Sequence, residues 1–225
     1  SKAVKKAPVA PPLKDLLNRD TVGGLARGIA AVEPSLNRAR FLDDVFDASW
    51  DGLELKQRVR HVATVLGRHL PGDYATQART LVQATPHLPD AGFAGIALPE
   101  FVDVYGQHDV KRSLDALEVL TTVQSAEFAV RPFLRDHAEV TLARMSEWAE
   151  HPDWRVRRLA SEGSRPRLPW GMALRDLQAH PERALPILEK LRRDPSEDVR
   201  RSVANHLNDI AKDHPRVVTR TCAAW

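Results

Sequence analysis

A short pattern occurs twice in the C-terminal part of the chain, 43 positions apart. The segment "HPDWRVRRLA", residues 151–160, returns as "DPSEDVRRSVA", residues 194–204, so that a proline, a valine and two consecutive arginines recur in register. A period of this length, with a proline-led turn before a V-R-R helix, is typical of HEAT-like repeats. Such repeats stack side by side, and the pattern therefore predicts an all-α chain that forms a curved solenoid with a concave face.

The rest of the chain also favours helices, because no segment keeps the period-two alternation that a half-buried strand needs. Residues 35–46, with Ser35 as the expected N-cap, and residues 53–71 carry apolar side chains at helical spacing. Weaker echoes of the repeat occur at residues 58–63 ("RVRHVA") and 109–114 ("DVKRSL"). Further helices are predicted to begin near residues 73, 99, 109, 125, 137, 153, 170, 181, 196 and 215.

Composition excludes several classes of protein. No apolar run is long enough to cross a bilayer, and the single cysteine, Cys222, excludes an internal disulfide framework or a cysteine-rich zinc site and fits a reducing cytosol. The nine histidines form no H-E-x-x-H motif, and no glycine-rich phosphate loop is present, so no metal or nucleotide cofactor is expected. Residues 1–12 are polar and proline-rich without the apolar core of a signal peptide, so we expect a flexible tail before a single domain, residues 13–225.

Positive charge gathers in the C-terminal third. The whole chain has a net charge of +3, whereas residues 151–220 hold fifteen Lys and Arg against ten Asp and Glu. Stacked repeats would align their V-R-R arginines on one side, and the guanidinium group suits bidentate contacts to phosphate. One alternative is an ordinary solvated helix face, which charge alone favours, and another is that these arginines pair with acids of neighbouring repeats. The residues of this predicted basic stripe are Arg157, Arg158, Arg200 and Arg201, with Lys111 and Arg112.

The loop in "RLASEGSRPRLPWG", residues 158–171, holds more arginine, proline and aromatic residues than a simple connection between two helices requires. It holds two arginines, Arg165 and Arg167, and its prolines prevent a regular helix through Pro169. Trp170 is therefore expected at or near a helix start. The alternative is that this tryptophan only fills a gap between helices.

Three acids lie close to the basic segments: Glu127, Glu162 and Asp209. A carboxylate in a partly desolvated groove is costly unless a cation accompanies it, either a protein side chain or a bound ligand. The structural alternatives are local ion pairs at helical spacing. These would join Glu127 to Arg131, Glu162 to Arg158 and Asp209 to Lys212.

Three strings together resemble a known family. "SAEFAVRPFL" (residues 125–134), "VRRLASEGSRPRLPWG" (156–171) and "RRSVANHLNDIAKDHP" (200–215) are similar to motifs of the AlkC-type alkylpurine-DNA glycosylases of bacteria. That family belongs, with the AlkD type, to the HEAT-like-repeat superfamily. The resemblance is strong from about residue 127 to 225 and continues more loosely back to "PPLKDLLNRD", residues 11–20.

The resemblance implies a DNA glycosylase that hydrolyses the N-glycosidic bond of cationic N3-methylated bases in duplex DNA, the first step of base excision repair. The implied substrates are chiefly 3-methyladenine, with 3-methylcytosine as a second, and the lesion is thought not to be flipped fully into a pocket. By motif matching, Glu127, Glu162 and Asp209 are the catalytic acids and Trp170 contacts the lesion. The residues expected to bind the DNA backbone are Arg157, Arg158, Arg165, Arg167, Arg200 and Arg201.

The chemistry agrees with these residue types. An N3-methylated base is already cationic and leaves without a general acid, while the oxocarbenium-like transition state is stabilised by nearby carboxylates that can also position water. An indole face adds cation–π attraction of about 2 kcal/mol when desolvated. Of the three acids we expect Glu162 and Asp209 to matter most, because Arg131 offers Glu127 a partner one helical turn away.

A second hypothesis is a non-catalytic HEAT-repeat scaffold that binds DNA or protein. It uses the arginines but gives the three acids no role. With the first hypothesis we expect a monomer in the bacterial cytoplasm, associated with the nucleoid, that binds alkylated duplex DNA without a membrane or a metal. Members of the family commonly continue beyond a segment such as the final "TCAAW", so the resemblance leaves open a further repeat or domain after Trp225.

Overall fold

A computed structural model describes residues 12–225, which form α-helices and short 3-10 helices without a strand in that range. The predicted tail, residues 1–12, lies outside the described residues except for Pro12. The α-helices are α1 (Arg19–Ala30), α2 (Arg38–Val45), α3 (Leu55–His69), α4 (Tyr74–Ala84), α5 (Ala97–Tyr105), α6 (Val110–Leu120), α7 (Arg131–Asp136), α8 (Ala138–Trp148), α9 (Trp154–Gly163), α10 (Arg175–Ala179), α11 (Leu185–Leu191), α12 (Glu197–Ala211) and α13 (Pro215–Ala224). The 3-10 helices are η1 (Leu13–Leu16), η2 (Trp50–Gly52), η3 (Thr85–His87), η4 (Gly92–Ile96) and η5 (Pro181–Arg183).

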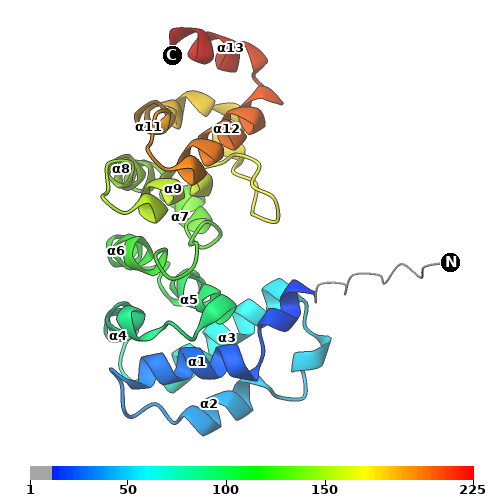
Figure 1. Ribbon diagram of the computed structural model, residues 1–225, viewed down its shortest axis with the longest axis vertical. Helices are drawn as coiled ribbons and strands as arrows, with labels where there is room; N and C mark the ends of the chain where they lie inside the picture. The colour runs from blue at the N-terminus through cyan, green and yellow to red at the C-terminus, as the bar shows by residue number, and fades with distance from the viewer. Residues whose placement is uncertain (1–11) are drawn as a thin grey trace, which may run out of the picture.

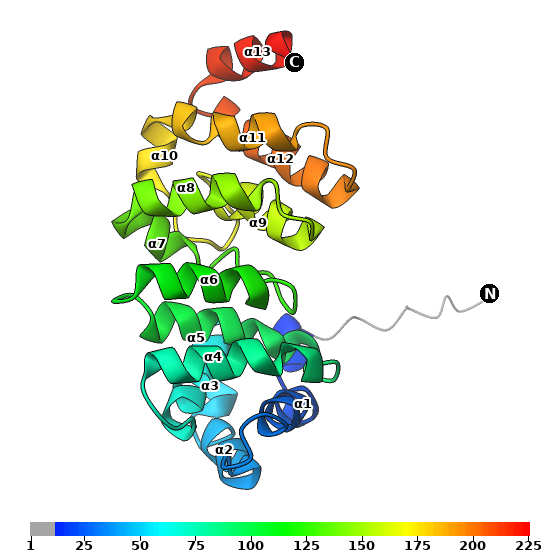
Figure 2. The same ribbon diagram turned by 90° about the vertical axis from the view of Figure 1, so that its left-hand side faces the viewer.

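The helices form two stacked layers along an elongated molecule. Helices α4, α6, α8 and α11 lie one above another in the first layer, and α3, α5, α9 and α12 lie beside them in the second (Figures 1 and 2). Contacts run within and between the layers, with α3 on α5, α4 on α6, α8 on α9 and α9 on α12. The predicted all-α solenoid of HEAT-like repeats is therefore confirmed.

The repeated V-R-R pattern has a structural explanation. Its valines, Val156 and Val199, are fully buried in the core. The first arginine of each pattern turns back to the preceding proline-led turn: Arg157 Nη1 donates to the carbonyl oxygens six and five residues earlier, both at 2.9 Å, and Arg200 Nη1 does the same at 2.6 and 3.0 Å. Each of these arginines thus ties its helix to the turn that begins the repeat.

Three predicted helix starts are wrong. Helix α2 is capped by Asn37, whose side chain accepts from the backbone N–H of Arg40, while Ser35 bonds to Glu33. The window predicted from residue 125 is a turn, and α7 begins at Arg131. Trp170 does not begin a helix, because residues 164–174 form a loop that precedes α10.

The described part of the chain, residues 12–225, has no helix that is both long and apolar enough to cross a membrane. Its apolar core is one cluster that extends from Leu17 to Ile210. The second layer of the solenoid, with the loops between its helices, carries the residues that the sequence marked as functional.

Candidate functional site

The three acids predicted from the sequence converge, and arginines separate them. Glu127 lies in the turn before α7, Glu162 in the last turn of α9 and Asp209 in the last turn of α12. Arg158 lies 3.1 Å from Glu127 and 3.7 Å from Glu162, measured between nitrogen and oxygen atoms. Arg165 lies 2.8 Å from Glu162 and 2.9 Å from Asp209. We call this alternation of three carboxylates and two guanidinium groups the acid cluster.

The inner part of the acid cluster is buried. Glu162, Arg165 and Asp209 are 6%, 8% and 3% exposed. Arg165 donates one hydrogen bond to each acid, and the second oxygen of Glu162 accepts from Ser202 Oγ at 2.6 Å. Burial acts to lower the pKa of Arg165, but the hydrogen bonds and charges of Asp209 and Glu162 outweigh it and raise that pKa above its usual value. The buried carboxylates therefore remain paired and hydrogen-bonded, as buried charges must be.

These contacts bear on the local ion pairs that the sequence offered as alternatives. The pairs of Glu162 with Arg158 and of Asp209 with Lys212 exist, at 3.7 and 3.5 Å, but both acids make shorter contacts to Arg165. The pair of Glu127 with Arg131 is wrong. Arg131 is fully buried and points to the backbone, where it donates to the carbonyl oxygens of Gly163, at 3.0 Å, and Met172, at 2.7 Å.

Arg131 thereby joins the end of α9 to the loop that follows it. Burial, together with the nearby charge of Arg165, lowers the pKa of Arg131 to about 10. The cost of burying this guanidinium is offset by its backbone hydrogen bonds, which satisfy two carbonyl groups that no helix could satisfy. The loop is therefore held from behind by an arginine that the sequence assigned elsewhere.

Trp170 is the exposed tip of this loop. Its side chain is 68% exposed, and its φ of 61° makes it the one non-glycine residue with positive φ among residues 12–225. The left-handed region costs a non-glycine residue on the order of 1–2 kcal/mol, and such strain persists only where surrounding contacts enforce it. The amide of Gly171 donates to Leu168 O at 3.0 Å, and Lys56 Nζ donates to Trp170 O at 2.7 Å.

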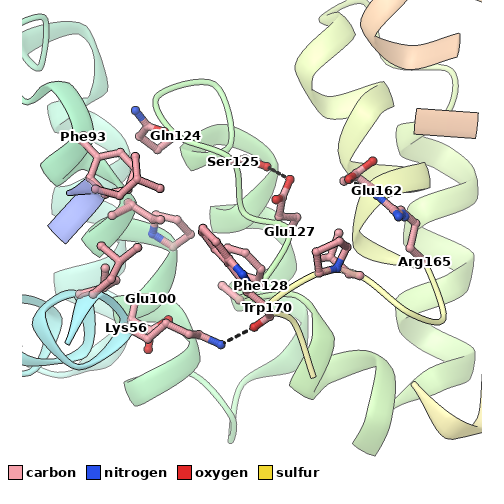
Figure 3. Close-up of a pocket in the computed structure, with 18 residues that line it drawn as sticks. Lys56, Phe93, Glu100, Gln124, Ser125, Glu127, Phe128, Glu162, Arg165 and Trp170 are labelled. Carbon is pink, nitrogen blue, oxygen red and sulfur yellow. Dashed lines mark hydrogen bonds and ion pairs between the residues drawn. The ribbon is translucent and has the colours of Figure 1, made fainter. Parts of the chain in front are cut away.

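A cavity of about 430 Å³ lies beside Trp170 and part of the acid cluster. Figure 3 shows Glu127, Glu162 and Arg165 on one side of it and Phe93, Glu100 and Lys56 on the other. The remaining lining is mostly apolar and comes from η1, α3, η4, α5, the turn before α7 and the loop before Trp170. Asp209 is not among the lining residues, because Arg165 lies between it and the cavity.

The arginines of the predicted basic stripe have different surroundings. Arg157 forms a two-point ion pair with Asp194, at 2.6 and 2.9 Å, and its side chain is only 13% exposed. Arg157 and Arg165 thus both have carboxylate partners within the protein, and contacts from them to DNA phosphate stay a prediction. Arg167 pairs with Asp213 but is 40% exposed, and Arg201 pairs with Glu197 and is 61% exposed. Arg158 is half-buried and Arg200 is exposed.

Sequence reasoning missed Ser202, Lys56 and Glu100. Ser202 could have been noticed in the sequence, because the repeat aligns it with the buried apolar Leu159. A polar residue at a core position of one repeat is unusual and marks a candidate site residue. Glu100 reaches the cavity from the opposite wall, pairs with Arg60 at 2.8 Å, and has its pKa raised by burial. Lys56 gave no signal, because nothing in the sequence joins it to a loop 114 residues away.

The donor set of the site does not resemble a metal centre. Within residues 12–225, no three His, Cys, Asp or Glu side chains are grouped so that they could hold a metal ion. In the acid cluster, a guanidinium group occupies each place between two carboxylates where a cation would bind.

Comparisons with known proteins agree with the resemblance drawn from the motifs. A family model described as HEAT repeat matches residues 184–214, which contain α11 and α12. The uncharacterised protein YhaZ of Bacillus subtilis (strain 168) is 42% identical over 213 residues, which cover 95% of this chain and 59% of YhaZ.

A solved structure, Pseudomonas fluorescens alkylpurine DNA glycosylase AlkC bound to DNA containing an abasic site analogue, is 43% identical, with a TM-score of 0.89, over 96% of this chain and 59% of the other. The chain therefore spans about three fifths of the length of each relative, 59% in both cases.

Proposed function

Since the chain is a HEAT-like-repeat protein of the AlkC type, we propose that it is a DNA glycosylase that releases cationic N3-methylated bases, 3-methyladenine and 3-methylcytosine, from duplex DNA. The observation that carries the proposal is the placement of Glu127 and Glu162 on the wall of a cavity whose edge is the strained, exposed Trp170. Two carboxylates beside an indole form a site for a cation.

The reaction needs little from the protein at the base. Methylation at N3 gives the base a positive charge, so the glycosidic bond breaks without protonation of the leaving group. As it breaks, positive charge develops on the sugar, and carboxylates that are already in place stabilise it without reorganisation. Of the three acids of the acid cluster, Glu127 and Glu162 reach the cavity and can orient the attacking water, while Asp209 acts on this wall through Arg165.

The arginines within the acid cluster set its strength. Glu127 and Glu162, the predicted acids at the cavity wall, share the guanidinium groups of Arg158 and Arg165, and Asp209 is also paired with Lys212 at 3.5 Å. In this proposal the selectivity comes from the charge of the lesion, because carboxylates attract a cationic base more strongly than a neutral one. Trp170 adds the face of its indole, whose attraction to a desolvated cation is about 2 kcal/mol.

DNA is proposed to bind along the second layer of the solenoid. Arg158, Arg167, Arg200 and Arg201 remain candidates for phosphate contacts, because each is at least partly exposed. Arg167 and Arg201 would exchange a surface acid for a phosphate oxygen. Arg200 bonds to backbone carbonyls, and Arg158 pairs with two acids of the acid cluster. Surface ion pairs such as that of Arg167 with Asp213 contribute about 0–1 kcal/mol, so exchanging the partner costs little.

Release of free base from methylated duplex DNA tests the proposal. The purified protein should release 3-methyladenine in single turnovers and should leave uracil in place, since uracil is neutral and needs activation of the leaving group. Efficient release of uracil would overturn the electrostatic mechanism. Binding of duplex DNA without release of any methylated base would favour the non-catalytic scaffold.

A further inference from the structure

Lys56 occupies an unusual electrostatic position. It lies in the first turn of α3, where the positive end of the helix dipole disfavours a cation. Of the five lysines in residues 12–225, it is the one without a carboxylate oxygen within 4.0 Å; Lys14, Lys111, Lys190 and Lys212 all form ion pairs. Neither the helix dipole nor ion pairing therefore accounts for the place of this lysine.

Its contacts lie across the cavity instead. Lys56 Nζ donates a hydrogen bond to the backbone carbonyl of Trp170 at 2.7 Å, and the same nitrogen lies 5.2 Å from the centre of the Phe128 ring. Figure 3 shows the bond running from α3 to the loop that carries the tryptophan. It joins the N-terminal repeats to the loop that follows α9, two parts of the chain that are 114 residues apart.

The carbonyl that accepts this bond belongs to the strained residue. Trp170 has a φ of 61°, and a non-glycine residue keeps such a conformation only when its surroundings over-determine it. Arg131 holds the loop from the protein interior at Met172 O, while Lys56 holds it from the opposite side at Trp170 O. The carbonyl groups of Trp170 and Met172, one on each side of Gly171, are thus both held, which restricts the backbone that presents the indole.

We propose that Lys56 is a positioning residue that holds Trp170 in its left-handed conformation and so orients the indole at the edge of the cavity. The inference rests on the proposed function only for its kinetic consequence, because the position of the indole can be measured in the free protein. Two substitutions distinguish the contribution of the hydrogen-bond donor from that of the aliphatic chain. Lys56→Met keeps the aliphatic chain and removes the donor, whereas Lys56→Arg keeps a donor and the positive charge. Lys190→Met, which removes an ion-paired lysine of α11, is the matched control.

The first experiment is spectroscopic. The protein has five tryptophans, and a Trp170→Phe variant identifies the indole N–H resonance of Trp170 in a ¹⁵N correlation spectrum. In Lys56→Met this resonance should move or split by more than its line width, while the other four remain in place, and Lys56→Arg should restore it. An unchanged Trp170 resonance in Lys56→Met would overturn the proposal, whether or not the protein proves to be a glycosylase.

The second experiment measures base release in single turnovers on DNA with 3-methyladenine. Lys56→Met should lower the rate constant at saturating enzyme by about tenfold to a hundredfold, since small misplacements of a contact group are costly, with DNA affinity changed by less than about twofold. In a Trp170→Ala background the same substitution should change the rate by less than about twofold, because Lys56 acts through the tryptophan. Lys190→Met should match the wild type.

A direct phosphate contact by Lys56 predicts different results. DNA affinity would then fall equally in the wild-type and Trp170→Ala backgrounds, and the slope of log affinity against log salt would decrease in magnitude by about one. That outcome would overturn the positioning role. Absence of base release by the wild-type protein would refute the proposed function and leave the spectroscopic result to decide the role of Lys56.

Discussion

At the scale of single residues, Arg165 organises the acid cluster. It contacts both buried acids, Glu162 and Asp209, and all three side chains are less than a tenth exposed. Two like charges could not be buried so close together without a cation between them. The residue that the sequence assigned to the DNA backbone is thus the counter-ion that allows the acids to be present.

We predict that Arg165→Ala lowers the free energy of unfolding by about 3–5 kcal/mol, because it leaves two buried carboxylates without their shared partner. Arg167→Ala, two residues later and 40% exposed, should change it by less than about 1 kcal/mol. Urea denaturation of both variants at neutral pH measures the difference. Equal free energies of unfolding for the two variants would mean that the pairing of Arg165 with the two acids does not stabilise the fold.

His206 gives a prediction for pH. The imidazole is fully buried, its Nδ1 bonds to Ser161 O at 3.0 Å, and its Nε2 has no partner within residues 12–225, so burial lowers its pKa from 6.5 to about 4. Above pH 6.5 the imidazole is neutral in both the folded and the unfolded protein. Below pH 6.5 it takes up a proton in the unfolded chain but stays neutral in the folded protein, so the stability of the fold decreases as the pH drops towards 4. The loss should reach about 3 kcal/mol.

His206→Asn keeps a donor near the position of Nδ1 for Ser161 O but cannot titrate in this range. Melting curves between pH 7 and pH 4.5 should therefore show a smaller loss of stability for the variant than for the wild type. Parallel curves for the two proteins would show that His206 does not contribute to the acid sensitivity.

At the scale of elements, the repeat pattern predicted α9 and α12 well because its two recurring features are local. The valine of each V-R-R is buried and the first arginine bonds to its own turn, so the pattern encodes one helix start at a time. Glu162 and Asp209 could be named because they lie in these same two helices, whereas Glu127 was named from its motif alone. The loop could not be predicted, because Arg131, Lys56 and Trp170 meet only through tertiary contacts.

Helix α1 shows the opposite case, in which packing overrides helix propensity. Its segment "RDTVGGLARGIA" holds three glycines, which weaken a helix, and periodicity did not predict a helix there. Two of the glycines allow close approach of backbone: a Cβ at Gly24 would lie 2.1 Å from Asp90 O, and one at Gly28 would lie 2.3 Å from His87 O. Asn18 caps the helix through its side chain.

The adjacent glycines of α1 provide a matched pair of variants. Gly24→Ala should destabilise the protein by about 1–3 kcal/mol, because the new methyl group meets backbone that cannot move away. Gly23→Ala should stabilise it by up to about 1 kcal/mol, since its Cβ would lie 3.6 Å from the flexible end of Arg27 and alanine favours the helix. Thermal melts compare them. Equal effects would mean that α1 does not pack closely on the segment that contains Asp90.

At the scale of the whole molecule, the two layers place basic and acidic groups on the same stack. Residues 151–220 carry the excess positive charge, and they include all of the acid cluster except Glu127. Many of these arginines are paired with acids of the protein, so fewer guanidinium groups are free to contact phosphate than the sequence suggests. DNA binding in this account exchanges surface ion pairs for phosphate contacts and leaves the buried ones intact.

The dependence of duplex DNA affinity on salt concentration tests which arginines contact phosphate and which stay paired within the protein. Arg167→Ala and Arg201→Ala should each reduce the slope of log affinity against log salt by about one, because each removes one phosphate contact. Arg157→Ala should lower stability through loss of its pair with Asp194 and leave the slope unchanged. A reduced slope for Arg157→Ala, with no change for Arg167→Ala, would reverse the assignment.

The central claim is that carboxylates at the cavity wall stabilise the transition state for loss of a cationic base. Single-turnover release of 3-methyladenine by Glu127→Gln and Glu162→Gln, each measured well below its melting temperature, tests it most directly. Each substitution keeps the shape and removes the charge, so base release should slow by about tenfold to a thousandfold while DNA affinity holds or rises. Full activity in both variants, with lowered melting temperatures, would show that these acids serve only as ion-pair partners and would contradict the account.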